Sequence, residues 1–138
     1  MASVDPSSNV LLASKKSFED LTLEMEAGAE RLLRSIRSFA GKHQEILTRM
    51  KKLQDEGIIR ATPHWRQNKY LYLIYPMRKG ERRRKYIGAD RYKIKEALEA
   101  VKRVDEYEFL LQRLSRLENV LSLSHDELNR AVQTLERG

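Results

Sequence analysis

A heptad repeat of apolar residues is the feature that most constrains how this chain can fold. The repeat alternates spacings of four and three residues from Phe18 to Leu53. Its positions are Phe18, Thr22, Met25, Ala29, Leu32, Ile36, Phe39, His43, Ile46, Met50 and Leu53. Such spacing is typical of a coiled coil or a long packed helix. We therefore predict a helix over residues 14–57, capped by Ser14 or Ser17 and ended by Gly57.

A second apolar seam predicts another long helix over residues 89–138, with Asp90 as its N-cap. Its later part reads Tyr107, Leu110, Leu114, Leu117, Leu121, Ser124, Leu128, Ala131 and Leu135. The earlier stripe, Ile94, Ala97, Val101 and Val104, is out of phase with it. This shift near residues 104–107 indicates a change of packing partner or of local supercoil. The run Ser124-His125-Asp126-Glu127 fits a capping box, which allows a break near residue 123.

The segment between the two helices, residues 58–88, has the sequence pattern of a β-hairpin. Residues 69–75, KYLYLIY, are aromatic and β-branched, with Tyr70, Tyr72 and Ile74 on one face and Leu71, Leu73 and Tyr75 on the other. Residues 78–81, RKGE, form a short turn in which Gly80 can take a positive φ. Residues 82–87 return as the second strand, and residues 58–62 are a candidate third strand before Pro63.

These elements predict a mainly α fold. Two long antiparallel coiled-coil-like helices would be connected by a basic β-hairpin, with a third short strand as an option, in one domain. Residues 1–13 contain Pro6, Ser7, Ser8 and Asn9 and are expected to form a flexible arm. Apolar seams on both helices leave surface for a second chain, so we expect a homodimer.

The positive charge of the chain is concentrated in the middle segment. Residues 1–59 hold nine basic and nine acidic residues, and residues 89–138 hold nine and ten. Residues 60–88 hold nine basic residues against Glu81 alone, a net +8, whereas the whole chain carries +7. A localised basic patch indicates a polyanionic partner, most often nucleic acid. The plainer interpretation is a solvated charged face.

No catalytic or metal-binding constellation is visible in the sequence, and we expect neither an enzyme nor a cofactor. His43, His64 and His125 lie far apart, and His43 falls on the helical seam. The acidic clusters lie in Lys- and Arg-rich helical patterns, where surface ion pairs are expected. The chain contains no cysteine, which is compatible with a reducing compartment. We recognise no signal peptide and no apolar run long enough to cross a bilayer, so we expect a cytoplasmic protein, nucleoid-associated if bacterial.

A basic, tyrosine-rich ribbon can enter the major groove of DNA. The predicted contact residues are Arg66, Lys69, Arg78, Lys79, Arg82, Arg83, Arg84, Lys85 and Tyr86. Alternation along the return strand would place Arg82 and Arg84 on one face and Arg83 and Lys85 on the other. For most of the tyrosines we favour packing of the sheet on the following helix, while exposed rings could contact phosphates or unpaired bases. RNA and an acidic protein remain alternative partners, the latter for a coiled-coil adaptor.

Residues 69–88, KYLYLIYPMRKGERRRKYIG, followed by residues 90–103, DRYKIKEALEAVKR, resemble the N-terminal arm-type DNA-binding domain of phage tyrosine recombinases. Such domains pair a Tyr-rich strand with an Arg- and Lys-rich strand that ends near a glycine. They then add a helix, and their sheet reads the major groove. The resemblance covers residues 58–103 and includes no recombinase catalytic domain. It implies a stand-alone DNA-binding or accessory protein from a mobile element. From DNA binding itself we expect a role in gene regulation or in the maintenance of a plasmid or mobile element.

Overall fold

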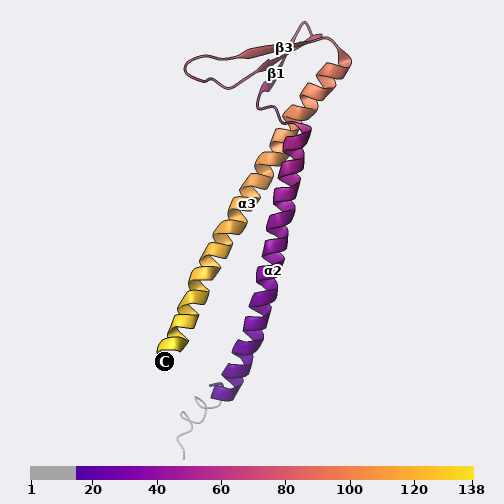
Figure 1. Ribbon diagram of the computed structural model, residues 1–138. Helices are drawn as coiled ribbons and strands as arrows, with labels where there is room; N and C mark the ends of the chain where they lie inside the picture. The colour runs from indigo at the N-terminus through magenta and orange to yellow at the C-terminus, as the bar shows by residue number, and fades with distance from the viewer. Residues whose placement is uncertain (1–14) are drawn as a thin grey trace, which may run out of the picture. The chain divides into compact units, whose positions relative to one another are not determined.

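The computed structural model describes residues 15–138, so the predicted arm at residues 1–13 and the candidate cap Ser14 lie outside the described residues. The element order is α2 (Phe18–Glu56), β1 (Thr62–Arg66), β2 (Tyr70–Ile74), β3 (Arg84–Gly88) and α3 (Arg91–Arg137). Two long helices with a small antiparallel sheet between them in sequence confirm the predicted fold class (Figure 1). The described residues divide into two compact units, residues 15–40 and 41–138.

The predicted helix ends are confirmed where the structure describes them. The Ser17 hydroxyl accepts a hydrogen bond from the Asp20 amide at 3.0 Å, so Ser17 caps α2. Helix α2 ends before Gly57, which has φ +102° and donates its amide to the Leu53 carbonyl at 3.0 Å. Asp90 caps α3 through hydrogen bonds from the amides of Tyr92 and Lys93. Both long helices therefore begin at an oxygen-bearing cap residue that the sequence predicts.

The predicted break near residue 123 is wrong, because α3 runs without interruption from Arg91 to Arg137. The Ser124–Glu127 run has the composition of a capping box, but no glycine or proline lies between residues 89 and 137. A capping box stabilises a helix start only where the backbone leaves helical geometry. Nothing in this part of the sequence forces it to do so.

Residues 41–56 of α2 run antiparallel to α3. As α2 advances, the residues that it contacts lie progressively earlier in α3: His43 contacts Glu118, Arg49 contacts Glu106, and Glu56 contacts Arg103. Between them lies a core of Ile46, Met50, Leu53 and Leu110, against which Ile58, Tyr107, Leu114 and Leu117 pack. The seams therefore meet within one chain over this stretch.

The sheet has the order β1-β2-β3, and both of its pairings are antiparallel. Both hairpin loops have two central residues with positive φ, Gln67 (55°) and Asn68 (53°) in the first and Lys79 (51°) and Gly80 (77°) in the second. Such loops match the twist of the strands that they join. In the second, Arg78 and Glu81 exchange backbone hydrogen bonds of 2.8 and 2.9 Å. The predicted turn at residues 78–81 is confirmed.

The third strand exists, but its predicted position at residues 58–62 is wrong, because β1 begins at Thr62 and includes Pro63. Proline cannot donate a backbone hydrogen bond, but β1 is an edge strand, where one side of the backbone needs no partner. The preceding residues fasten the sheet to the helix instead: the Ile59 amide donates to the Ala100 carbonyl at 3.1 Å. The predicted return strand is also shorter than expected, since it begins at Arg84.

The sheet packs on the first turns of α3 through a second core. Leu71, Leu73 and Ala97 are buried, and Ile59, Ala61, Tyr75, Ile87, Ile94, Leu98 and Val101 pack around them. The early stripe of α3 therefore contacts the sheet, and the later stripe contacts α2 from Tyr107 to Leu117. This arrangement confirms that α3 changes its packing partner near residues 104–107.

Candidate nucleic-acid interface

One face of the sheet is buried against α3, and the other is uncovered within residues 41–138. On β2, Leu71 and Leu73 are fully buried, while Tyr70, Tyr72 and Ile74 alternate with them. Directly paired residues of an antiparallel sheet share a face. The register therefore defines an open face consisting of Thr62, His64 and Arg66 from β1, Tyr70, Tyr72 and Ile74 from β2, and Arg84 and Tyr86 from β3. The open face contains no acidic residue.

Three tyrosines form the centre of the open face. The ring of Tyr86 lies 5.0 Å from that of Tyr72 and 6.4 Å from that of Tyr70, measured between centroids. Tyr86 remains 56% exposed. The expectation that most tyrosines pack on the following helix is wrong for these three, because their alternation with Leu71 and Leu73 turns them away from α3. Tyr75 does pack with the sheet–helix core, as expected.

Basic side chains flank this tyrosine cluster. Arg66 is paired with Tyr70 and Arg84 with Ile74, which places one arginine on each outer strand of the open face. Lys69, in the loop between β1 and β2, holds its ammonium group 5.7 Å from the centre of the Tyr70 ring. Because arginine presents a planar fork of donors, Arg66 and Arg84 can bind phosphates and the edges of guanine bases.

The remaining predicted residues lie elsewhere on the hairpin. Lys85 is paired with Leu73 and therefore lies on the helix side of β3. Arg83 accepts a backbone hydrogen bond from Tyr75 at 2.9 Å and lines a hollow of about 850 Å³ with Arg60, Tyr75, Arg78 and Lys79. The predicted alternation is confirmed for Arg84 and Lys85, whereas Arg82 and Arg83 both precede the strand. The structure thus divides the basic run between two sides of the hairpin.

Within the part of the chain that the structure describes, the predicted basic residues form no ion pair. Over residues 15–138, the cationic residues that form ion pairs include Lys16, His43, Arg49, Arg60 and Arg103. None of the nine predicted contact residues takes part in one. Arg60, which belongs to the same basic segment of the sequence, pairs with Glu108 and lies 5.5 Å above the Tyr107 ring. Arg60 therefore has a structural role, and the uncompensated charge lies on the sheet.

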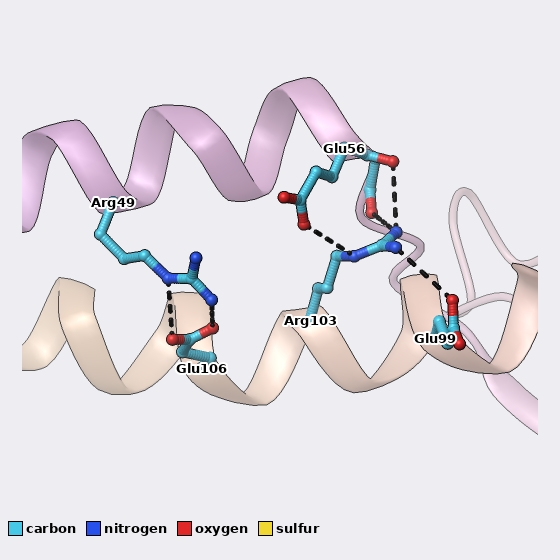
Figure 2. Close-up of polar contacts among 6 residues, drawn as sticks. Arg49, Glu56, Glu99, Arg103 and Glu106 are labelled. Atoms are coloured by element: carbon cyan, nitrogen blue, oxygen red, sulfur yellow. Dashed lines mark hydrogen bonds and ion pairs between the residues drawn. The ribbon is translucent and has the colours of Figure 1, made fainter.

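Arg103 of α3 fixes the point where α2, the connecting segment and α3 meet (Figure 2). Its guanidinium donates to the backbone carbonyls of Glu56 at 3.2 Å and of Gly57 at 2.9 Å. It also lies 3.4 Å from the Glu56 carboxylate and 3.9 Å from that of Glu99. Carbonyls at a helix C-terminus lack partners within the helix. A cation from α3 thus completes the end of α2, and it anchors the start of the segment that leads into the sheet.

A second ion pair connects the helices further along (Figure 2). Arg49 binds Glu106 through two hydrogen bonds of 3.0 and 2.8 Å. The hydrogen bond from Arg49 lowers the pKa of Glu106, and the same bond raises the pKa of Arg49. Sequence reasoning treated these side chains as generic surface charges, because nothing in the spacing identifies which acid faces which base across two helices.

Comparisons with protein-family models, with curated proteins and with solved structures found no match. Within residues 15–138, no helix is both long and apolar enough to span a bilayer. The same residues contain no group of three His, Asp or Glu side chains arranged to hold a metal ion.

Proposed function

We propose that this chain is a non-enzymatic DNA-binding protein whose sheet enters the major groove with its open face. The observation that carries the proposal is a sheet face with arginine on both outer strands, tyrosines between them and no acid. Duplex DNA is a dense polyanion, and Lys and Arg contacts to its phosphates supply most of the non-specific affinity. The excess of basic residues in this segment supports such a partner.

The dimensions of the sheet support duplex DNA in particular. Neighbouring strands are about 4.8 Å apart, so the outer strands of a three-stranded sheet lie roughly 10 Å apart. The major groove of B-DNA is about 12 Å wide and admits β elements. In this arrangement Arg66 and Arg84 reach base edges or inner phosphates from the open face. The loop residues Lys69, Arg78 and Lys79, together with Arg82, contact the flanking backbone.

The resemblance to arm-type domains agrees with this arrangement, since it implies a sheet that reads the major groove beside a supporting helix. We extend the proposal to a role in gene regulation, or in the maintenance of a plasmid or mobile element. Such a protein works in the cytoplasm, at the nucleoid if it is bacterial.

A titration with a fluorescent 30-bp random-sequence duplex at two salt concentrations tests the proposal. We expect tight binding that weakens steeply with salt, because several phosphates are neutralised. Replacing Arg82, Arg83 and Arg84 together with alanine should weaken binding strongly and leave the helical circular dichroism unchanged. Unlabelled duplex DNA, single-stranded RNA and an acidic protein serve as competitors. Absence of binding at low salt, or displacement only by RNA or by the acidic protein, would contradict DNA binding.

We also propose that the chain is a homodimer. The seam residues Leu110 and Leu114 are engaged with α2 inside the chain, so a dimer must use other apolar side chains. Phe109 (59% exposed) and Leu111 (42%) of α3 lie outside that core. A Leu114→Asp variant would test the folding of the single chain and not the assembly of two chains, because Leu114 packs in the chain's own core. Sedimentation equilibrium of the full chain, which should give twice the monomer mass, is the direct test.

A further inference from the structure

A second groove lies on the side of β1 that faces α3, away from the open face. It has a volume of about 910 Å³ and lies between β1 and the first three turns of α3. Its apolar lining comes from Pro63, Trp65, Ile94, Leu98 and Val101. Trp65 is paired with buried Leu71, which places it on the helix side of the sheet, yet it is 43% exposed. A large aromatic ring left exposed in an apolar groove marks a candidate contact surface.

The rim of this groove is strongly basic. Lys69, Arg91, Lys95 and Lys102 border it, against a single acid, Glu99, which already lies 3.9 Å from Arg103. An apolar groove with a basic rim matches an amphipathic helix with acidic side chains beside its apolar stripe. The stretch of α3 from Arg91 to Lys102 is about 16 Å long at 1.5 Å per residue. It therefore accommodates a helix of about three turns.

The chain itself contains a segment with this chemistry, residues Phe18–Glu30 at the start of α2. The segment carries five acids, Glu19, Asp20, Glu24, Glu26 and Glu30, and no basic residue. Its large apolar side chains Phe18, Leu21, Leu23 and Met25 are 46–84% exposed. Phe18, Leu21 and Met25 share one helical face. Within residues 15–40 α2 is the only element, so no other element of that unit covers this face.

We propose that the groove of one chain binds Phe18–Glu30 of a second copy. The four basic residues of the rim face the acids of the segment, and Trp65 and Leu98 receive its apolar side chains. Glu24 forms an exposed ion pair with Lys16 at 2.7 Å, which exchanges readily for a partner on the rim because both groups remain solvated. This inference names the surfaces that form the proposed homodimer, and these surfaces share only Lys69 with the proposed DNA-binding surface.

Trp65 is the only tryptophan in the chain, so its fluorescence reports the groove directly. In a dilution series of the full chain, we expect the emission maximum to move to longer wavelength as the second copy dissociates. Addition of a synthetic peptide with the sequence of residues 18–30, which lacks tryptophan, to the dilute protein should reverse that shift. A peptide of the same composition with the apolar spacing scrambled is the control and should bind at least tenfold more weakly.

Charge reversal on the rim tests the same contact with the fold kept intact. Arg91→Glu combined with Lys102→Glu should weaken peptide binding at least tenfold. The matched control, Lys93→Glu with Arg113→Glu, changes the same net charge on exposed positions of α3 outside the groove and should bind the peptide normally. The proposal is overturned if Trp65 emission responds to neither dilution nor peptide, or if both double variants lose binding equally. The open-face variant Arg66→Ala with Arg84→Ala should still bind the peptide, which separates this result from any failure of DNA binding.

Discussion

Helix α3 presents two different surfaces to two different partners. Its first turns contact the sheet through Ile94, Ala97, Leu98 and Val101, with the small residue Ala97 buried at the contact. Its middle contacts α2 through the larger side chains Tyr107, Leu110, Leu114 and Leu117. The small side chain of Ala97 leaves room for Leu71 and Leu73 of the sheet, whereas the larger side chains interdigitate between the two helices. The phase shift of the apolar stripe is where one packing mode replaces the other.

The comparison explains how a charged sheet can stay exposed and still be held firmly. The two cores are joined by the short segment after Gly57, which is fixed by Arg103 and by the hydrogen bond from Ile59 to Ala100. The helix pair provides a stable support, and the sheet needs only one buried face. Its other face is left for a ligand.

Truncation of one leucine in each core should give the largest effects. Leu53→Ala and Leu73→Ala each remove a side chain that is at most 1% exposed, and each should cost about 2–5 kcal/mol of unfolding free energy. Urea unfolding is followed by circular dichroism for the helices and by Trp65 fluorescence for the sheet. We expect Leu73→Ala to shift the fluorescence transition more and Leu53→Ala the dichroism transition. Identical shifts in both signals would show that the two regions unfold as one unit.

Replacement of Arg103 should weaken the joint between the regions. Arg103→Met leaves the carbonyls of Glu56 and Gly57 without their cationic donor, at an expected cost of about 1–3 kcal/mol. Arg103→Lys keeps the charge but not the planar fork of donors, and it should lower the free energy of unfolding by less than Arg103→Met does. Hydrogen exchange of the amides at residues 57–61 should quicken in the methionine variant. Unchanged exchange would mean that the backbone bond of Ile59 holds the segment alone.

Two glycine substitutions should change stability in opposite directions. Gly80 has φ +77° in the tip of the hairpin, so Gly80→Ala introduces strain of roughly 1–2 kcal/mol. Gly41 lies inside α2, where an added Cβ meets no atom within 4 Å, and Gly41→Ala should stabilise the helix by about 0.5–1 kcal/mol. Thermal unfolding of both variants shows whether each substitution raises or lowers the stability. A stabilised Gly80→Ala protein would contradict the turn geometry.

The ion pair between Arg49 and Glu106 should give the smallest effect, a dependence of stability on acid pH. The pKa of Glu106 is lowered by its hydrogen bond with Arg49. Its stabilising contribution is therefore present above the pKa of the unfolded state and is lost as pH falls through the lower pKa of the folded state. Both groups are solvated, so the effect is modest. Glu106→Gln should flatten this part of the pH–stability curve, whereas Glu118→Gln, at the pair with His43, serves as the control for a different contact between the helices.

Much of the fold follows from local sequence. The heptad spacing, Gly57, Asp90 and the tip at residues 78–81 each act within a few residues, so their outcomes are predictable. The third strand was misplaced because Pro63 argues against a strand unless the strand is known to lie at an edge. The loop at Gln67 and Asn68 contains no glycine, and only asparagine tolerates its conformation readily. The continuity of α3 past Ser124 likewise depends on the absence of a breaker more than on any positive signal.

The candidate site was predicted in composition but not in geometry. The basic residues could be selected from the charge distribution, and Tyr86 from its place as an aromatic residue in the same run. Which of them share a face depends on the register, and the structure shows an irregularity where Leu71 pairs with Gly88 and Tyr72 with Tyr86. Without that register, the grouping of Tyr70, Tyr72 and Tyr86 with Arg66 and Arg84 could not be derived. The pairing of Arg60 with Glu108 joins residues far apart in sequence, so the sequence alone does not predict it.

The most direct test of the central claim compares the two sides of the hairpin in duplex binding. Arg66→Ala with Arg84→Ala removes two charges from the open face, and Arg83→Ala with Lys85→Ala removes two from the helix side of the sheet. Affinity for the 30-bp duplex is measured for both variants at two salt concentrations. We expect at least about a tenfold larger loss for the open-face variant, with a shallower salt dependence than that of the unmodified protein. Equal losses, or a larger loss for the helix-side variant, would contradict binding through the open face.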